Sequence, residues 1–296
     1  MADTNGQDAA TIRQFLAGPY SLRRPQLKQA TIEQYGYSIG SFGRHLGREP
    51  VLADFTDGCL QRFIRARLAE VSAKTVHRER QDLLCLWREA ARDGLVAPPG
   101  DVPRVKVPKR NPIAFWPEEL SRLLAACSSL RGCVVGTEIP RSAWARSFLL
   151  ALYDTGARKS ALLACEAPDL DWDRKMVRLS ADHAKTGLEQ WVGLSDQSME
   201  ALLQIWVDRR VIWPWPGDRR QLYYLLDRLL LVAGLPCDRY HKWHAIRRTT
   251  ATYLTKAGGL GVAQQVLGHT SPSQTLGYVD QRHLDQVNAC GLLPRV

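Results

Sequence analysis

The feature that most constrains the fold is a proline-rich segment one third of the way along the chain. Residues 96–112 read Val-Ala-Pro-Pro-Gly-Asp-Val-Pro-Arg-Val-Lys-Val-Pro-Lys-Arg-Asn-Pro, with five prolines and one glycine. Proline lacks the backbone N–H that a helix uses and clashes with the preceding turn, so no helix can run through this segment. We therefore predict an extended, basic, exposed linker between two domains, residues 1–95 and 113–296.

The residues before the linker show the apolar spacing of helices. Segments 31–46 and 57–68 repeat apolar residues every three or four positions, and a third helix is expected from Ser72, a suitable N-cap, to about Arg92. The first turns of this third helix hold polar and basic side chains, namely Lys74, Thr75, His77, Arg78 and Arg80. Because its later turns are apolar, the basic end can project toward an acidic partner, or it can be a solvated charged face.

The charge balance favours a nucleic-acid partner. The chain carries a net charge of +10, of which residues 1–110 contribute +6. Such an excess favours an acidic partner, and nucleic acid is the commonest one, although a merely basic protein would show the same total. Lys106, Lys109 and Arg110 of the linker extend the charge. Together with the basic turns of the third helix they form our predicted DNA-binding surface.

The residues after the linker predict helices and one β-hairpin. Trp116 precedes a helix start with proline and acids in its first turn, and residues 144–154 form an apolar helix stopped by Gly156. Residues 176–180 and 190–195 have strand character, with a polar turn between them. The rest is helical, so the fold class is mainly α with a small antiparallel β-sheet.

The sequence lacks the common signatures of cofactor and metal sites. The seven cysteines are scattered without a CxxC pair, and no Walker loop, GxGxxG motif or two-metal carboxylate cluster is present. We therefore expect no cofactor and no metal. No apolar run approaches membrane-spanning length, and residues 1–8 do not resemble a secretory signal, so we expect a cytoplasmic protein without a membrane partner.

Two short segments place cations where a phosphate could bind. Arg158 follows Thr155-Gly-Ala at the expected start of a helix, and both a helix N-terminus and a guanidinium favour phosphate oxygens. Lys185 lies in the turn between the two strands, from which a movable cation could reach a ligand and donate a proton. Taken singly, an arginine at a helix start is more often solvated or salt-bridged, and a hairpin lysine is exposed by default.

Two further segments supply candidate proton-transfer and nucleophilic groups. His244 and Arg247 are three residues apart, so on a helix they share one face. His269 follows the helix-ending Gly268, and Tyr278 is expected near the end of a short helix that begins at Ser271-Pro272. Taken singly, His244 could be a structural histidine, and a lone tyrosine most often serves packing.

Together, in order and spacing, the four segments resemble the motifs of the tyrosine recombinase (phage integrase) family. The family's motifs look like T-G-x-R-x-S-E-L, a lysine in a β-turn, H-x-L-R-H/R-T-x-A-T and L-G-H-x-S-x-x-T-T-x-x-Y. The resemblance covers about residues 116–278 and, more weakly, the helical N-terminal part. Two positions depart from the pattern: Ala161 replaces the acid that helps to hold the active site in the family, and Gly277 precedes the tyrosine.

The resemblance implies a fold and a chemistry. It implies a two-domain clamp, with a helical, SAM-like core-binding domain at 1–95, a linker at 96–112 and an α+β catalytic domain with a C-terminal tail at 113–296. It also implies a site-specific recombinase or integrase that joins DNA to protein through a 3′-phosphotyrosine link. The implied roles are nucleophile for Tyr278, phosphate binding for Arg158, Arg247 and His269, leaving-group protonation for Lys185, and proton movement at the nucleophile for His244.

The resemblance also implies partners and leaves alternatives open. The expected partner is double-stranded DNA with paired inverted half-sites, bound by a homotetramer. Without DNA the protomers are expected to be monomeric or weakly associated. Integration of a mobile element is one reaction of this kind. Apolar residues in the tail, 279–296, suggest docking on a neighbouring protomer or on the parent molecule. The alternatives are a catalytically impaired DNA-binding relative, favoured only by Ala161, and a type IB topoisomerase-like enzyme that relaxes any supercoiled DNA.

Overall fold

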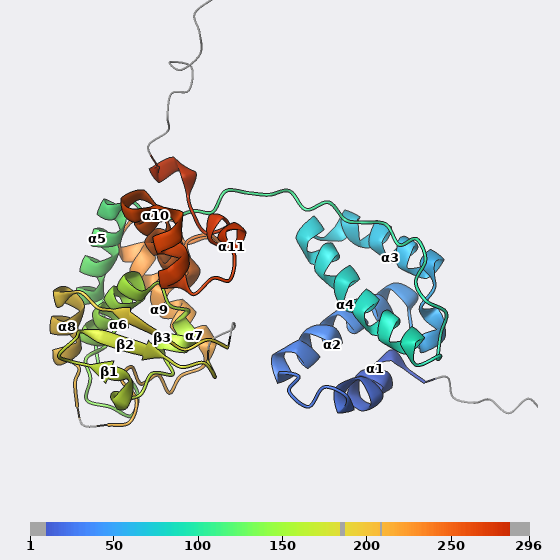
Figure 1. The fold of residues 1–296 in the computed structure, drawn as a ribbon, viewed down its shortest axis with the longest axis horizontal. Coiled ribbons are helices and arrows are strands. Elements are labelled where there is room, and N and C mark those ends of the chain that lie inside the picture. The colour runs from blue at the N-terminus through green and yellow to red at the C-terminus, as the bar shows by residue number, and fades with distance from the viewer. Residues whose placement is uncertain (1–9, 184–186, 208, 285–296) are drawn as a thin grey trace, which may run out of the picture. The chain divides into compact units, whose positions relative to one another are not determined.

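The described residues form two compact units. The computed structural model describes residues 10–183, 187–207 and 209–284, and the chain divides into Met1–Lys109 and Arg110–Val296 (Figure 1). Helices dominate both units, and the second adds a small three-stranded antiparallel sheet. The predicted fold class, mainly α with a small antiparallel sheet, is confirmed.

The first unit is helical throughout. Its helices are α1 (Ile12–Phe15), a π-helical turn (Leu16–Tyr20), α2 (Gln29–Leu46), a 3₁₀ turn (Leu52–Asp54), α3 (Asp57–Glu70) and α4 (Ala73–Arg92). The core between α2, α3 and α4 contains the fully buried side chains of Phe42, Phe63 and Leu83. Ser72 caps α4 as predicted, because its hydroxyl accepts the backbone N–H of Thr75 at 3.3 Å.

The first half of the predicted linker is packed, which corrects our expectation that it is exposed. Residues 97–116 have no regular secondary structure, but Val102 and Val105 are each only 8% exposed and belong to the core of the first unit. The indole N–H of Trp87 donates to the carbonyl of Ala97 at 2.7 Å. Val102 and Val105 anchor an otherwise largely exposed extended segment, so residues 96–105 extend the first unit.

Arg80 also differs from its prediction as a DNA-binding residue. It is 8% exposed and donates to the carbonyl oxygens of Val102 at 2.7 Å and Pro103 at 2.6 Å. On a helix, position 80 shares a face with Val76 and Leu83, both fully buried, so its side chain points into the unit. Arg80 therefore holds the packed segment in place and does not face a ligand.

The second unit surrounds a buried helix with shorter elements. Its helices are α5 (Pro117–Ala126), α6 (Arg141–Thr155), α7 (Lys159–Leu162), α8 (Asp196–Leu203), α9 (Arg219–Val232), α10 (Trp243–Leu267) and α11 (Pro272–Leu276). Short 3₁₀ turns cover Cys127–Ser129, Ala167–Asp169 and Gln281–His283. Nine side chains of α6 are buried, and this helix packs against α10 and α8.

The sheet has the predicted hairpin and one additional strand. β2 (Met176–Leu179) pairs antiparallel with β3 (Gln190–Gly193), with Val177 opposite Val192. β1 (Leu170–Asp171) pairs antiparallel with β2 and was not predicted, because two residues are too few to show an alternating pattern. β2 and β3 flank the turn that contains Lys185, which lies outside the described residues.

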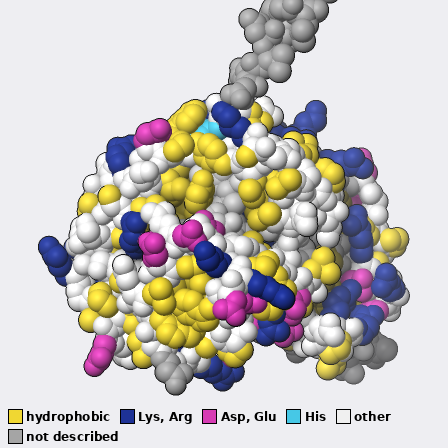
Figure 2. Space-filling view, turned by 60° about the vertical axis from the view of Figure 1, so that its left-hand side comes forward, with side chains coloured by type: hydrophobic (Ala, Val, Ile, Leu, Met, Phe, Trp, Pro, Cys, Tyr) yellow, Lys and Arg dark blue, Asp and Glu magenta, His cyan; other side chains and the backbone are white. Residues whose placement is uncertain are grey.

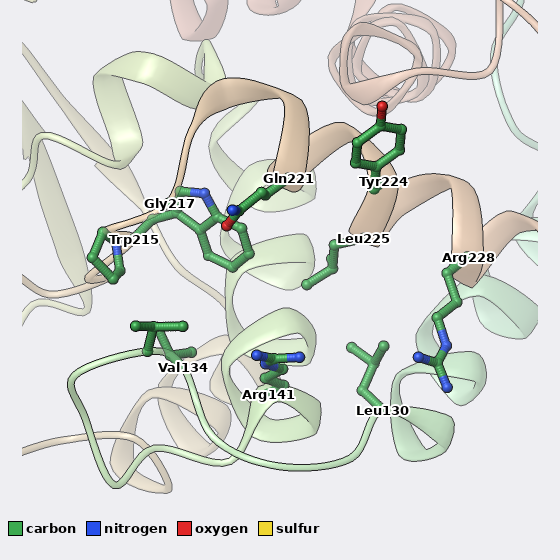
Figure 3. Close-up of a pocket in the computed structure, with 11 residues that line it drawn as sticks. Leu130, Val134, Arg141, Trp215, Gly217, Gln221, Tyr224, Leu225 and Arg228 are labelled. Carbon is green, nitrogen blue, oxygen red and sulfur yellow. The ribbon is translucent and has the colours of Figure 1, made fainter.

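The second unit has a pocket at the start of α6, away from the end of this helix that carries the motif residues. The space-filling view shows acidic, basic and apolar side chains intermixed over one face, which is not the continuous basic footprint expected for DNA binding (Figure 2). A pocket of about 400 Å³ is lined by Leu130, Arg141, Trp215 and Tyr224, among others (Figure 3). Arg141 begins α6, so the pocket lies roughly 20 Å along this helix from Thr155 and the adjoining Arg158.

Candidate active site

Tyr278 lies among three of the other predicted catalytic residues. Its ring centroid is 4.9 Å from that of His244 and 4.8 Å from that of His269, and the Arg247 guanidinium carbon lies 5.3 Å from it. Tyr278 follows α11 by two residues, just beyond the helix end where we expected it, and its backbone N–H donates to the carbonyl of Thr275 at 2.8 Å. A phenol oxygen, two imidazoles and a guanidinium therefore belong to one cluster.

Arg247 is the buried centre of this cluster. It is 4% exposed, and its guanidinium donates to the carbonyl of Gly156 and, at 2.9 Å, to the carbonyl of Leu267. These carbonyls belong to the ends of α6 and α10, where helix geometry leaves them without intrahelical partners. Burial, followed by the charge of Arg158, lowers the pKa of Arg247 to about 10. Its Nε is buried and has no hydrogen-bond partner among the described residues.

His269 is held in one tautomer by its two partners. Its Nε2 lies 3.0 Å from Nη2 of Arg247, and its Nδ1 lies 3.1 Å from the hydroxyl of the fully buried Thr275. A guanidinium only donates, so Nε2 accepts and Nδ1 carries the proton. Burial, then the charges of Arg247 and Arg158, lower the pKa of His269 to about 4, so the ring is neutral at pH 7.

His244 lies in the first turn of α10, and its ring packs against the ring of Tyr278. One side of the residue is exposed, while protein atoms and cations crowd the other side. This crowding, followed by the charges of Arg248 and Arg247, lowers the pKa of His244 to about 4. The ring is therefore a neutral imidazole beside a phenol, and it can accept a proton.

Arg158 completes the positive side of the cluster. It is the N-cap residue of α7 with extended backbone (φ −69°, ψ 134°), and it is half-buried. Its charge lowers the pKa of Arg247 and of both histidines, so it lies near all three. Within the described parts of the chain its guanidinium has neither a hydrogen bond nor an ion pair. Position 161, where the family has an acid, is a buried alanine and offers no carboxylate.

Lys185 is the sixth predicted catalytic residue, and its turn is not described. The base of the hairpin adjoins the cluster, because Nε2 of Gln190, at the start of β3, donates to the carbonyl of Gln265 at 2.6 Å. Gln265 lies in the last turn of α10, which leads to His269. The hairpin therefore leaves the sheet beside the histidine, and the position of the lysine itself remains a prediction.

Sequence reasoning missed the groups that hold the cluster together. Thr275 fixes the tautomer of His269, and the carbonyls of Gly156 and Leu267 orient Arg247. Thr275 occupies one of the two threonine positions of the fourth motif, and this match was an available signal. The carbonyl partners carry no side-chain signature, so only the fold reveals them.

The predicted DNA-binding residues differ in their surroundings. Lys74, Thr75, Lys106 and Lys109 are exposed, and so is Arg78, which also lies 3.6 Å from Asp82. His77 is partly buried, and Arg110 donates to the hydroxyl of Tyr240. Apart from the inward-pointing Arg80, these side chains remain candidates for DNA contact. Where the chain is described, no cluster of three His, Cys, Asp or Glu could hold a metal ion, and no helix is long and apolar enough to cross a membrane.

Comparison with known proteins relates the site to one family. Residues 115–284, more than half of the chain, match the phage integrase family. The chain is 31% identical over 147 residues to tyrosine recombinase XerC of Corynebacterium glutamicum, covering 45% of each chain, so the match spans about half of that relative. It is 24% identical to tyrosine recombinase XerD of Yersinia pestis, covering 92% of this chain and 93% of the relative.

A solved structure supports the same fold. The crystal structure of a lambda integrase tetramer bound to a Holliday junction matches 95% of this chain and 81% of that chain, with a TM-score of 0.69 and 19% identity. At this identity the match shows the fold of the chain. The assignment of individual residues still depends on the motifs and on the geometry around Tyr278.

Proposed function

The chain belongs to the phage integrase family, and on that premise we propose that it is a site-specific recombinase that cuts and rejoins DNA through Tyr278. The observation that carries the proposal is the position of the Tyr278 ring, between the rings of His244 and His269 and beside the guanidinium of Arg247. A nucleophile, neutral proton acceptors and an incompletely paired cation at one place are what phosphodiester transfer needs.

The geometry supports a division of roles among the five described residues, and the role of Lys185 rests on the motif alone. The phosphate would bind between Arg247 and Arg158, whose charges are not neutralised by an acid among the described residues. His244, neutral and beside the phenol, would take the proton as the Tyr278 oxygen attacks phosphorus. Lys185 would protonate the leaving 5′ oxygen. The product is a 3′-phosphotyrosine link that keeps the energy of the broken bond for rejoining.

His269 has a more specific role in this scheme. Its Nε2 accepts from Arg247, so it orients the guanidinium before DNA binds. Contact with a phosphate oxygen through Nε2 would need a proton on that nitrogen, because both atoms are otherwise acceptors. The negative phosphate would favour this change, because it offsets the positive charges that lower the histidine pKa.

The proposed partner is duplex DNA with paired inverted half-sites, bound by four protomers. The net positive charge of the first unit supports DNA binding, and the similar lambda integrase structure is a tetramer on a Holliday junction. We further propose that the protein acts in the cytoplasm and that the first unit, residues 1–95 with the packed segment to 105, is its core-binding domain.

Covalent capture tests the proposed nucleophile. The substrate is a nicked duplex built on inverted repeats of roughly 11 base pairs, about one duplex turn per protomer, taken from DNA beside the gene. The wild-type protein should form an adduct that survives denaturation, and Tyr278→Phe should form none while binding normally. Tyr224→Phe, an exposed tyrosine at the pocket of Figure 3, is the matched control and should form the adduct.

Two further measurements separate the proposal from its alternatives. A catalytically impaired relative would bind the site without any adduct. A topoisomerase-like enzyme would relax a supercoiled plasmid that lacks the site, whereas a recombinase should act only on the plasmid with paired sites. Cleavage should persist in excess chelator, and binding should weaken steeply with salt as counterions are released. Cleavage that requires added magnesium would contradict the mechanism.

A further inference from the structure

The first residues of the second unit run beside the chain that follows the nucleophile. Residues 114–116, which we call the lead-in segment, each contact either α10 or residues 280–283. The N–H of Ala114 donates to Oδ2 of Asp280 at 2.9 Å. The N–H of Phe115 donates to Oγ1 of Thr249, also at 2.9 Å, and the ring of Trp116 stacks on His283 with centroids 3.7 Å apart. The lead-in segment is therefore fixed both to α10 and to residues 280–283.

Asp280 is the central connection of this arrangement. It is fully buried, and besides Ala114 it accepts from Nη2 of Arg282 at 2.6 Å. Its own backbone N–H donates to Oγ1 of Thr252 at 2.9 Å. Thr252 lies on α10, five residues after Arg247. One residue thus joins the lead-in segment, α10 and the chain that has just left Tyr278.

The carboxylate is suited to hold these contacts as an ion. Burial alone would raise the pKa of Asp280, but the hydrogen bonds from Arg282 and from the N–H of Ala114 outweigh burial and lower the pKa. The group therefore stays ionised at neutral pH. An ionised carboxylate accepts stronger hydrogen bonds than a neutral one, so the connection is firm.

The backbone of Tyr278 has few direct restraints. Its backbone N–H has one hydrogen bond, to Thr275, and the preceding residue is Gly277, which has no side chain to pack. Two residues span at most about 7 Å of extended chain, so the place of Asp280 limits where the backbone of Tyr278 can lie. Val279 between them is 2% exposed and adds a second buried anchor.

We propose that Asp280 is a positioning residue for strand cleavage, which fixes Tyr278 beside Arg247 and His269 by tying the chain after the nucleophile to α10 and to the lead-in segment. This inference rests on the proposed function. Asp280 does not touch the reacting atoms. Its effect is on the distance between the phenol oxygen and phosphorus, and a misplacement of about 1 Å can slow such a step roughly 100-fold.

The test compares Asp280 with a buried carboxylate elsewhere. Asp54, 7% exposed in the first unit, likewise pairs with an arginine, Arg48, and accepts one backbone N–H, from Val51. The variants are Asp280→Ala, Asp280→Asn and the control Asp54→Asn. Single-turnover cleavage is measured at saturating protein on the nicked substrate, with half-site affinity and thermal unfolding measured in parallel.

We expect slower cleavage without weaker binding. Asp280→Ala should cleave about 10- to 100-fold more slowly, with half-site affinity within about twofold of the wild type. Asp280→Asn keeps a carbonyl oxygen for the N–H of Ala114 and should recover part of the rate, even if the alanine variant unfolds. Asp54→Asn should lose comparable thermal stability and cleave at the wild-type rate. Equal loss of cleavage in Asp54→Asn and Asp280→Asn would overturn the positioning role.

A modified substrate excludes an effect on the leaving group. A sulfur atom in place of the bridging 5′ oxygen leaves without protonation, so it should restore cleavage to Lys185→Ala but not to Asp280→Asn. Restoration of the Asp280→Asn rate would overturn the inference, and so would wild-type cleavage by that variant on the ordinary substrate. Failure of the wild-type protein to form any adduct would instead reject the proposed function.

Discussion

The two halves of the candidate site differ in how firmly the protein itself holds them. In the inner half, Arg247 and His269 are at most 8% exposed, and hydrogen bonds to Thr275 and to the ends of α6 and α10 fix them. In the outer half, Arg158 has no partner in the described chain, and His244 is exposed on one side. The inner half is organised without DNA, whereas the outer half has open bonding capacity for a phosphate.

This difference separates two contributions to the reaction. A positive charge that is fixed in advance needs no reorganisation when charge develops on the phosphate, so the buried guanidinium of Arg247 supplies preorganised electrostatic stabilisation. Arg158 is partly exposed, so its guanidinium stays hydrated until the phosphate binds and can then contact the phosphate. Removal of an inner residue should therefore affect both folding and chemistry, whereas removal of an outer residue should affect mainly chemistry, with a smaller effect on folding.

The largest effect is expected for Arg247→Ala. The substitution leaves two buried carbonyls without their donor and removes a phosphate ligand. We expect the free energy of unfolding to fall by about 2–4 kcal/mol and single-turnover cleavage to fall by about 10³-fold. Denaturant unfolding and adduct formation measure the two effects. A variant with wild-type stability would show that the inner half is not held as described.

Arg158→Ala should show the second effect alone. Because the guanidinium lacks a described partner, the free energy of unfolding should change by no more than about 0.5 kcal/mol. Cleavage should still fall by roughly 100-fold, since a phosphate donor is lost. The same two assays apply. A stability loss as large as that of Arg247→Ala would remove the distinction between the halves.

Acid stability should depend more on His269 than on His244. The folded-state pKa of His269 is about 4, below the unfolded value of 6.5. Between these values the unfolded chain binds more protons, so the free energy of unfolding falls as pH drops from about 6.5 to 4, by at most about 3 kcal/mol from this residue. His269→Gln should reduce this fall. His244→Gln should act in the same direction but less, because solvent screens its exposed side.

That comparison is made by denaturant unfolding at several pH values for the wild type and the two variants. Carboxylates contribute the same acid-induced loss to all three proteins, so the differences between the curves isolate each histidine. A larger effect of His244→Gln than of His269→Gln would mean that His244 is the more deeply buried residue. It would then be His244, and not His269, that belongs to the inner half.

The smallest effect is expected from restoring an acid to the outer half. Ala161→Glu places a carboxylate in the first turn of α7, three residues after its N-cap Arg158, where it can orient the guanidinium. We expect a two- to fivefold faster cleavage, equivalent to less than about 1 kcal/mol. Ser160→Glu, at an exposed neighbouring position, is the control and should not change the rate. No gain in Ala161→Glu would show that Arg158 needs no such support.

Local signals in the sequence predicted much of this fold and of the cluster. The cap at Ser72, the helix-ending glycines 156 and 268 and the hairpin at 176–195 appear where short-range chemistry placed them. Gly277, the departure from the family pattern before Tyr278, has helical backbone with φ −66°. The three described motifs, which contain Arg158, His244 with Arg247, and His269 with Tyr278, come together because each lies at the end or start of an element.

Other features depend on long-range packing and left no local signal. The inward direction of Arg80 follows from the packing of Val102 and Val105 on the first unit, which places the carbonyls of Val102 and Pro103 beside its guanidinium. The contact between Ala114 and Asp280 joins residues 166 positions apart through a backbone N–H. α1 has only four helical residues, too few for a periodic pattern. Such contacts become visible only when the chain is folded.

The most direct test of the central assignment is to find the atom that carries the DNA. The trapped adduct is digested with nuclease and trypsin, which cuts after Lys256 and Arg282, and the peptide 257–282 is sequenced by mass spectrometry. Tyr278 is the only tyrosine in this peptide. Our account predicts a nucleotide joined through its 3′ phosphate to Tyr278. A nucleotide on any other residue, or one joined through its 5′ phosphate, would contradict it.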